Sequence, residues 1–248
     1  MHIHPPKPPH SWSDLLREVG VIVVGILLAL GAEQIIERLH WREQVEVAEG
    51  GIKSELEYSA VHAYQRLIVQ PCLQGQIRLL AQKLDEPGER WAATPALQDY
   101  GQWHSVITPV YLPPNRLWNR DYWENALASG VISHLDASRV ADHSYLYAQI
   151  SRMDDLQAKE LAIGSRLSIL GRDRLLTRIE RDEILGALGE LDRINGLMVL
   201  RSGQMLDHLK QAHLKYDRGA VERDRREAVQ HDRAIRGSCV ADLPLDLG

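Results

Sequence analysis

The apolar residues of the chain follow two different patterns. Residues 19–32 contain no charged side chain, and their apolar character covers every face of a helix. From residue 41 onward, apolar residues recur every three or four positions instead, as they do along one face of an amphipathic helix. No stretch alternates in the way of a half-buried strand. The patterns predict an all-α protein, in which an N-terminal transmembrane helix continues into an antiparallel bundle of about four long helices.

The uncharged segment is long enough to cross a membrane when its flanks are included. Val19–Ala32 covers only ~21 Å of helix, whereas a bilayer core is ~30 Å thick. Apolar residues resume after Glu33, so Val19–Ile36 covers ~27 Å, with Glu33 near one interface. Trp12 and Trp41 would lie ~43 Å apart, close to the spacing of the headgroup layers in which indole rings collect. We therefore expect the lipid bilayer to surround this helix.

Two other interpretations of the segment stay open. Ala29-Leu30-Gly31 could be the cleavage site of a signal peptide, although the acidic Asp14 and Glu18 argue against one. The segment could also be the core helix of a soluble protein. We favour the anchor, whose membrane positions include Val19, Gly25, Ala29, Ala32 and Ile36.

Small residues share one face of the predicted anchor. Gly25 and Ala29 are four residues apart, and Ala32 follows one turn later. Small residues allow two membrane helices to approach closely. This face could pair two copies of the chain in a homodimer, or pair the chain with another membrane protein. Spacings of this kind are also common in anchors that do not pair.

The charges at the two ends of the anchor do not decide its orientation. Lys7 and Arg17 precede it, and Arg38, Arg42 and Lys53 follow it. Lysine and arginine are enriched on the cytoplasmic side, so these counts lean slightly against an exported C-terminal domain. We nevertheless expect a short cytoplasmic tail and a periplasmic helical domain.

Composition and periodicity divide the chain into four parts. Residues 1–13 include four prolines, which lack amide donors, and we expect a disordered tail there. The anchor helix should cover 14–40 and the extramembrane helical bundle 41–218. Residues 219–248 lose the apolar periodicity and are rich in mixed charges, so we expect a loosely ordered tail.

Several residues mark the ends of the predicted helices. Gly50-Gly51 could be either a hinge or a break in the first long helix, and Pro71 should kink it. Asp136 is placed to cap a helix that runs to about residue 170. Thr177 and Glu180 have the spacing of a capping box, which opens the last long helix. A short helix is expected from Thr94 to about residue 103.

Overall charge and cysteine content restrict the partners and the covalent links. The net charge is −5 and the isoelectric point is about 6.1, so the chain lacks the basic footprint of a nucleic-acid-binding protein. Two cysteines are too few for a disulfide scaffold. Cys72 and Cys239 could form one bridge if the domain is exported, or remain as thiols if it is cytosolic.

The chain contains none of the common catalytic or cofactor signatures. It has no HExxH, GxSxG, P-loop, GxGxxG or CxxC motif. His208 and His213 are five residues apart, which places them on different faces of a helix and makes a poor metal chelate. We therefore predict no catalytic residue, no metal ligand and no cofactor.

Two segments of the chain have recognisable motifs. The first is EVGVIVVGILLAL, residues 18–30, and the second is WENALASG, residues 123–130, which is followed by Leu135 and Tyr147. The first resembles the apolar anchor that opens a family of bacterial single-pass membrane proteins of unknown function, and the second is similar to a W-E-x-A-x-x-S-G segment of that family. The resemblance implies a bacterial membrane protein with a helical extramembrane domain, which we expect in the inner membrane, and it implies no activity.

The second segment also has a physical interpretation of its own. It belongs to a predicted helix at residues 117–129, where Gly130 suits a left-handed C-terminal cap. The region is either a structural corner of the bundle or the wall of a ligand pocket. Its candidate residues are Trp118, Tyr122, Trp123, Ser129 and Gly130.

Three functions follow from these observations. The first is a membrane-anchored interaction or scaffold module, which the lack of catalytic motifs favours. The second is an extracytoplasmic bundle that senses a ligand at the predicted corner and acts through a membrane partner. The third is an enzyme with an unrecognised site.

Overall fold

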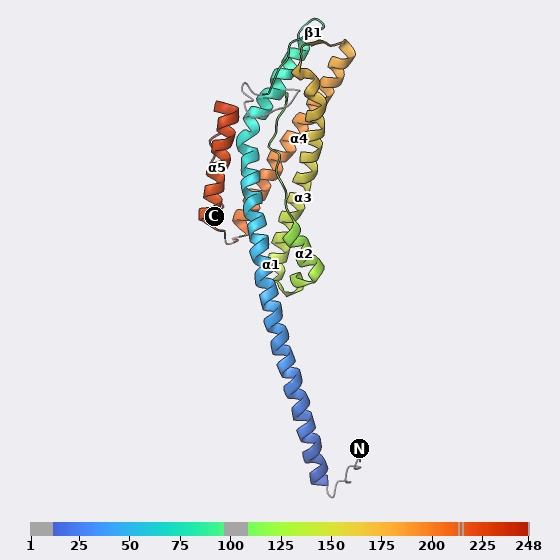
Figure 1. The fold of residues 1–248 in the computed structure, drawn as a ribbon, viewed down its shortest axis with the longest axis vertical. Helices are drawn as coiled ribbons and strands as arrows, with labels where there is room; N and C mark the ends of the chain where they lie inside the picture. Colours follow the sequence, from blue (N-terminus) through green and yellow to red (C-terminus); the bar gives the residue numbers. More distant parts are fainter. Residues whose placement is uncertain (1–11, 97–108, 213, 215, 248) are drawn as a thin grey trace, which may run out of the picture.

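A computed structural model of the chain describes residues 12–96, 109–212, 214 and 216–247. The described residues confirm the all-α class, because their only strands are two residues long (Figure 1). The elements are α1 (Trp12–Asp85), β1 (Arg90–Trp91), α2 (Asp121–Ser129), η1 (Val131–His134), α3 (Ala137–Arg166), η2 (Leu167–Gly171), β2 (Arg174–Leu175), α4 (Arg178–Gln211), α5 (Arg218–Arg236) and η3 (Gly237–Cys239).

Helix α1 is the longest element of the molecule. Its 74 residues extend over ~110 Å, and its N-terminal part projects from the bundle as a single free helix (Figure 1). Neither Gly50-Gly51 nor Pro71 ends it. The bundle helices pack only on its C-terminal half. The expected anchor that continues into a bundle is thus one uninterrupted helix.

The long helices do not simply alternate in direction. Arg139 near the start of α3 pairs with Glu49, and Glu160 near its end pairs with Arg66, so α3 runs parallel to α1. Helix α4 is antiparallel to both, since Arg181 in its first turn donates to the Leu84 carbonyl at the end of α1. The connection between α1 and α2 makes the parallel arrangement feasible, because its described residues 109–120 return the chain along the bundle without forming a helix.

We call the described part of that connection, residues 109–120, the strap. It lies in extended form between α1 and α3. Gln76 of α1 donates to the Val110 carbonyl at 2.9 Å, and Gln157 of α3 donates to the Arg116 carbonyl at 2.8 Å. The predicted short helix after Thr94 falls mainly in residues 97–108, which lie outside the described residues, as do residues 1–11 of the predicted disordered tail.

The starts of α4 and α3 test the two helix caps that the sequence predicts. The capping box is present in α4, where the Glu180 amide donates to Thr177 Oγ1 and the Thr177 amide donates to the Glu180 carboxylate at 2.7 Å. Asp136 precedes α3, but its side chain accepts no capping hydrogen bond. At the far tip of the bundle, β1 and β2 form a small antiparallel pair.

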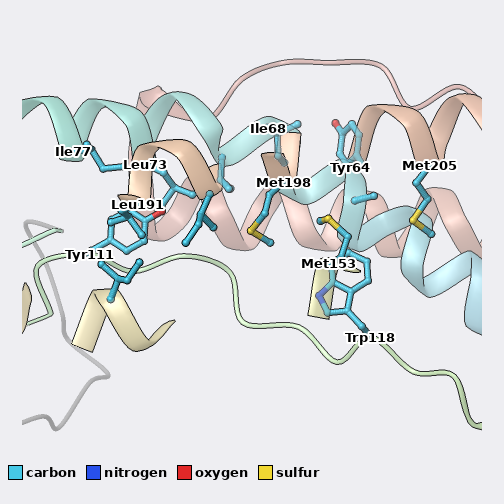
Figure 2. Close-up of a cluster of buried hydrophobic side chains, with 14 of the residues drawn as sticks. Tyr64, Ile68, Leu73, Ile77, Tyr111, Trp118, Met153, Leu191, Met198 and Met205 are labelled. Atoms are coloured by element: carbon cyan, nitrogen blue, oxygen red, sulfur yellow. The ribbon is translucent and has the colours of Figure 1, made fainter. Parts of the chain in front are cut away.

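The core is a long column of side chains between α1, α3, α4 and the strap (Figure 2). The protein has no phenylalanine, and tyrosine, tryptophan and methionine are among the large buried side chains of this column. Burial of these apolar surfaces supplies most of the favourable free energy of folding. The residues of this core column include Tyr64, Ile68, Leu73, Ile77, Tyr111, Trp118, Met153, Leu191, Met198 and Met205.

The prediction of a loosely ordered tail at residues 219–248 was wrong for its described part. Residues 218–236 form α5, which packs along α1, and residues 240–247 return along the same helix. The Ala241 amide donates to the Ile68 carbonyl at 2.8 Å, and the Tyr64 hydroxyl donates to the Leu243 carbonyl at 2.7 Å. Polar contacts of this kind leave no apolar periodicity, so the hydrophobic pattern of the sequence did not show them.

A disulfide joins Cys72 of α1 to Cys239 of η3 across 167 residues of sequence. This settles the alternative that the sequence left open between a bridge and two thiols. The bond fastens η3, which directly follows α5, to α1. In the chain-entropy description, a link across so long a loop restricts the unfolded chain strongly.

Replacing both cysteines, as C72S/C239S, should lower the free energy of unfolding by about 2–4 kcal/mol. The physical reason is the larger conformational freedom that the unfolded chain regains. Thermal unfolding of the full-length protein in mild detergent, followed by circular dichroism, measures the change. A reducing agent should reproduce the loss in the wild type and have no effect on the double variant. Equal stability of wild type and variant would contradict the prediction.

Candidate functional site

The predicted corner residues separate into a buried and an exposed group. Trp118 and Trp123 are buried, and the Trp123 ring stacks on the Tyr147 ring of α3 with 5.2 Å between centroids. Tyr122 leaves about half of its surface exposed. Gly130 has the left-handed conformation of a C-terminal cap, with φ 78°, and its amide donates to the Leu127 carbonyl. Ser129 Oγ donates to the Ala126 carbonyl at 3.4 Å.

Glu55 of α1 holds this corner together. Its carboxylate accepts a hydrogen bond from the Tyr122 amide in the first turn of α2, at 2.9 Å, and another from the Tyr147 hydroxyl of α3, at 2.5 Å. The side chain is buried, so these charge-assisted bonds replace lost hydration. Burial first, and then the hydrogen bond to Glu55, raise the pKa of Tyr147 well above its usual range. The Tyr147 hydroxyl is therefore a hydrogen-bond donor here and is not suited to acid–base chemistry.

Close packing of the Tyr122 ring against α1 accounts for one residue of the Gly50-Gly51 pair, Gly51. A Cβ atom at this position would lie 2.0 Å from the Tyr122 ring, closer than any van der Waals contact allows. The equivalent position at Gly50 is open. The pair therefore does not act as a break in the helix, since α1 continues through it, and Gly51 permits α2 to pack closely on α1.

A shallow hollow of about 340 Å³ opens beside the corner. Of the predicted pocket residues, Trp123 lines it, whereas Trp118 and Tyr122 do not. Arg120 and Glu124 form an exposed ion pair at its rim, with 3.6 Å between Nε and the carboxylate. The hollow could admit a small molecule against the Trp123 edge, but Arg120 and Glu124 already pair with each other and the Tyr147 hydroxyl is bound to Glu55.

A cluster of charged and polar side chains lies in the middle of the core. We call Arg66, Tyr111, Glu160 and Asn195 the buried network. Arg66 contacts both oxygens of Glu160, at 2.8 and 3.0 Å, and also donates to Asn195. The Tyr111 hydroxyl donates to Glu160 at 2.6 Å, and Asn195 Nδ2 donates to Tyr111 at 2.7 Å. The network joins α1, the strap, α3 and α4 at one level.

The network is sealed from solvent. None of its four side chains is more than 4% exposed. Burial first, and then the neighbouring Glu160 carboxylate, raise the pKa of Tyr111 far above its usual range. Glu160 and Arg66 neutralise each other, and a substrate would have to displace the packed core to reach them. The arrangement is suited to fixing the relative positions of four segments rather than to catalysis.

Sequence reasoning missed this network, although one signal was present. Asn195 lies between Leu191 and Met198 in the apolar series of α4, at a position where the periodicity calls for a hydrophobic residue. A polar residue inside an apolar stripe often meets a buried partner. Arg66, Glu160 and Tyr111 gave no comparable signal, because their partners come from segments far apart in the chain.

A second polar layer connects the strap to α5. Gln65 of α1 donates to Asp232, and Arg116 of the strap donates to Gln65. Arg236 pairs with Asp232 at 3.1 Å and donates to the Leu112 carbonyl at 2.7 Å. Asp232 is thus fully buried on a helix whose composition is mainly polar. This layer holds α5 against the bundle.

His62 is a partly buried histidine beside the strap. Its ring lies edge-on to Trp118, with 5.7 Å between centroids. Burial, and then the positive charge of Arg116, lower the pKa of His62 to about 4. The ring is therefore neutral at physiological pH.

The predicted pairing residues of the anchor are all available on the surface of α1. Gly25 has no neighbour within 4 Å of the position of its missing Cβ, and Ala29 and Ala32 are exposed. Val19 and Ile36 at the two ends of the span are also exposed. In the most apolar 18-residue window of α1, with a mean hydropathy of 2.3, no residue is buried.

In the described residues, no three histidine, cysteine or acidic side chains come together in an arrangement that would hold a metal ion. The prediction of no metal ligand covers the whole chain and stays a prediction, since the N-terminal histidines lie outside the described residues.

Comparison with known proteins gives no match. No protein-family model, no curated protein and no solved structure is similar to this chain.

Replacing Arg66 by leucine should lower the free energy of unfolding by about 3–5 kcal/mol, because Glu160 then remains buried without its counter-charge. The double variant R66L/E160L should recover much of that loss, since no buried charge is left unpaired. Thermal unfolding of the full-length protein measures both. A double variant that is as unstable as the sum of two single variants would contradict a coupled pair.

The low pKa of His62 predicts a pH-dependent loss of stability. Between pH 6.5 and about 4, the unfolded chain binds a proton at His62 that the folded protein does not bind. The contribution is full above pH 6.5 and declines as the pH falls to about 4, by a total of roughly 3 kcal/mol.

The measurement compares the pH dependence of stability in the wild type and in His62→Gln. The curve of the variant should fall less steeply between pH 6.5 and 4, whatever its stability at pH 8. Subtracting the stability curve of the variant from that of the wild type removes the contribution of the carboxylates, which titrate in both proteins. Parallel curves would show that His62 takes up its proton equally in both states.

Proposed function

We propose that this protein is a single-pass membrane protein whose helical bundle serves as an interaction or scaffold module beside the bilayer. The observation that carries the proposal is the continuity of α1. Its N-terminal half exposes apolar side chains on every face, and its C-terminal half is the central helix of the bundle. An apolar surface of this size in water would aggregate, whereas a bilayer of matching thickness would cover it.

The polar groups of the core are engaged in holding the helices together, which favours an interaction role at the surface of the bundle. The polar clusters of the core pair internally and join helices to one another. Exposed apolar side chains occur at several places on the bundle, and at the membrane-distal end Leu175 and Ile179 are 66% and 71% exposed. Such residues are suited to contact a partner protein. The partner could also be a second copy of the chain, joined through Gly25, Ala29 and Ala32 of the anchor.

We further propose that the bundle is exported to the periplasm of a bacterium and that the anchor lies in the inner membrane. The disulfide between Cys72 and Cys239 supports export, because such bonds persist in oxidising compartments. The resemblance of residues 18–30 and 123–130 to bacterial single-pass proteins supports the inner membrane.

A second function, ligand sensing, is favoured by one observation. The hollow beside Trp123 has an aromatic wall and lies at the junction of α2 with α3, where a bound molecule could shift the two elements. The hollow is open, and the Tyr147 hydroxyl behind it is already engaged by Glu55. The interaction module therefore explains more of the surface.

Membrane fractionation of cells that express the full-length protein tests the anchor and its orientation. We expect the protein to stay in the pellet after an alkaline carbonate wash, because α1 is embedded. Protease added from the periplasmic side should digest the bundle. A variant that lacks residues 1–36 should be soluble and mostly helical by circular dichroism. Release of the full-length protein by the wash would overturn the anchor, and protection of the bundle would reverse the orientation.

The interaction role is tested in the same membranes with a photo-crosslinking amino acid. Placed at Ile179, it should give a discrete adduct with a partner. Placed at Arg193, an exposed position elsewhere on α4, it should give none. Identical behaviour at the two positions would remove the support for a contact surface at the distal end.

A further inference from the structure

A hollow of about 440 Å³ lies where α1 enters the bundle. One wall is formed by consecutive turns of α1 and the other by His134 of η1. The His134 ring stacks on the Trp41 ring, with 4.1 Å between centroids and 20° between the planes. The stack fixes η1 against α1 and gives the hollow a defined shape. Its lining residues are Gln34, Glu37, Arg38, Trp41, Arg42, Val45 and His134.

The position of the hollow along α1 coincides with a headgroup layer. If the membrane span ends at Ile36, Arg38 and Arg42 lie ~3 Å and ~9 Å beyond it along the helix axis. A headgroup layer is about 5–7 Å thick on each side of the hydrocarbon core. Side chains of a helix lean toward its N-terminus, which in α1 is the direction of the bilayer. The two guanidinium groups therefore lie at the depth of lipid phosphates.

The two arginines are also free to bind an anion. Arg38 and Arg42 have no hydrogen-bond or ion-pair partner among the described residues, although acidic side chains occur nearby on the same helix. Glu49, one such residue, pairs with Arg139 of α3 instead. The hollow carries two arginines and one acidic residue, Glu37, which leaves one net positive charge in its lining.

We propose that this hollow binds the headgroup phosphate of an anionic phospholipid, such as phosphatidylglycerol. Guanidinium groups bind phosphate oxygens through paired, charge-assisted hydrogen bonds. The indole ring of Trp41 is suited to the boundary between lipid chains and water. One net positive charge matches one anionic lipid, whereas the cationic end of a zwitterionic headgroup would face the arginines unfavourably. The inference rests on the proposed function, because it requires α1 to span a bilayer.

The consequence is a fixed docking of the bundle on the membrane surface. The lipid would lie between α1 and η1, which is the part of the bundle nearest to the free half of α1 (Figure 1). A bound headgroup would therefore hold the base of the bundle at a defined height and rotation relative to the bilayer.

Native mass spectrometry of the full-length protein in detergent tests the proposal. The protein is mixed with equal amounts of phosphatidylglycerol and phosphatidylcholine, and the ratio of the two singly bound species is measured. The wild type should prefer phosphatidylglycerol at least roughly fivefold. The variant R38Q/R42Q should lose this preference. R17Q, which removes an arginine at the other end of the anchor, should keep it.

A further variant tests the shape of the hollow rather than its charge. His134→Ala leaves both arginines in place but removes the ring that stacks on Trp41, so it should weaken the preference. An unchanged preference in R38Q/R42Q would overturn the proposal, as would an equal loss in R17Q. Displacement of the lipid by millimolar inorganic phosphate would show that the hollow takes a free anion, and would overturn the lipid as its occupant.

Incorporation into vesicles of phosphatidylcholine alone separates this proposal from the proposed function. A protein that inserts there but shows no preference for phosphatidylglycerol would overturn only the lipid site. A protein that fails to insert into any vesicle would overturn both.

Discussion

Helix α1 supports every other part of the folded domain. Between Ile52 and Leu84 most of its side chains are partly or fully buried, because α4 and α5 pack on different sides of the helix (Figure 1) and side chains of α3 and the strap also reach it. The same helix supplies the carboxylate that holds the start of α2 and the cysteine that fastens the C-terminal segment. Because α1 is also the proposed anchor, the domain has no separate linker to the membrane. Any movement of the anchor in the bilayer is passed directly to the core.

Buried polar contacts give this packing its specificity. Apolar side chains alone would tolerate a shift of one helix turn along α1, since the column of leucine, isoleucine and methionine is similar at neighbouring levels. Arg66, Glu160, Asn195 and Tyr111 meet at one level only, and a shift would leave a charge buried without its partner. The cost of such a state is several kcal/mol. The network therefore adds little to stability relative to apolar residues, but it excludes alternative alignments.

At the junction between the anchor and the bundle, the continuity of α1 and a specific side-chain contact act together. About five residues separate Ile36 from Trp41, where the first contact with η1 occurs, so the bundle begins within one to two helix turns of the apolar span. A flexible tether would let the bundle rotate freely above the membrane. A continuous helix with a stacked Trp41–His134 pair at its base restricts that rotation. The geometry is suited to a protein that presents the same face to a partner or to the lipid surface at all times.

The sequence by itself determined the class of the fold and the apolar character of its N-terminal helix. Apolar periodicity and local caps such as that of Thr177 depend on residues a few positions apart, and they can be read without knowledge of the rest of the chain. Only the tertiary structure decided the parallel course of α1 and α3, the ordered α5, the disulfide and the buried network. Each of these depends on polar or covalent contacts between residues far apart in the chain, 90 positions for Arg139 and Glu49 and 167 for the two cysteines. Such contacts leave no periodic trace in the sequence, because their energy depends on partners that only the folded chain brings together.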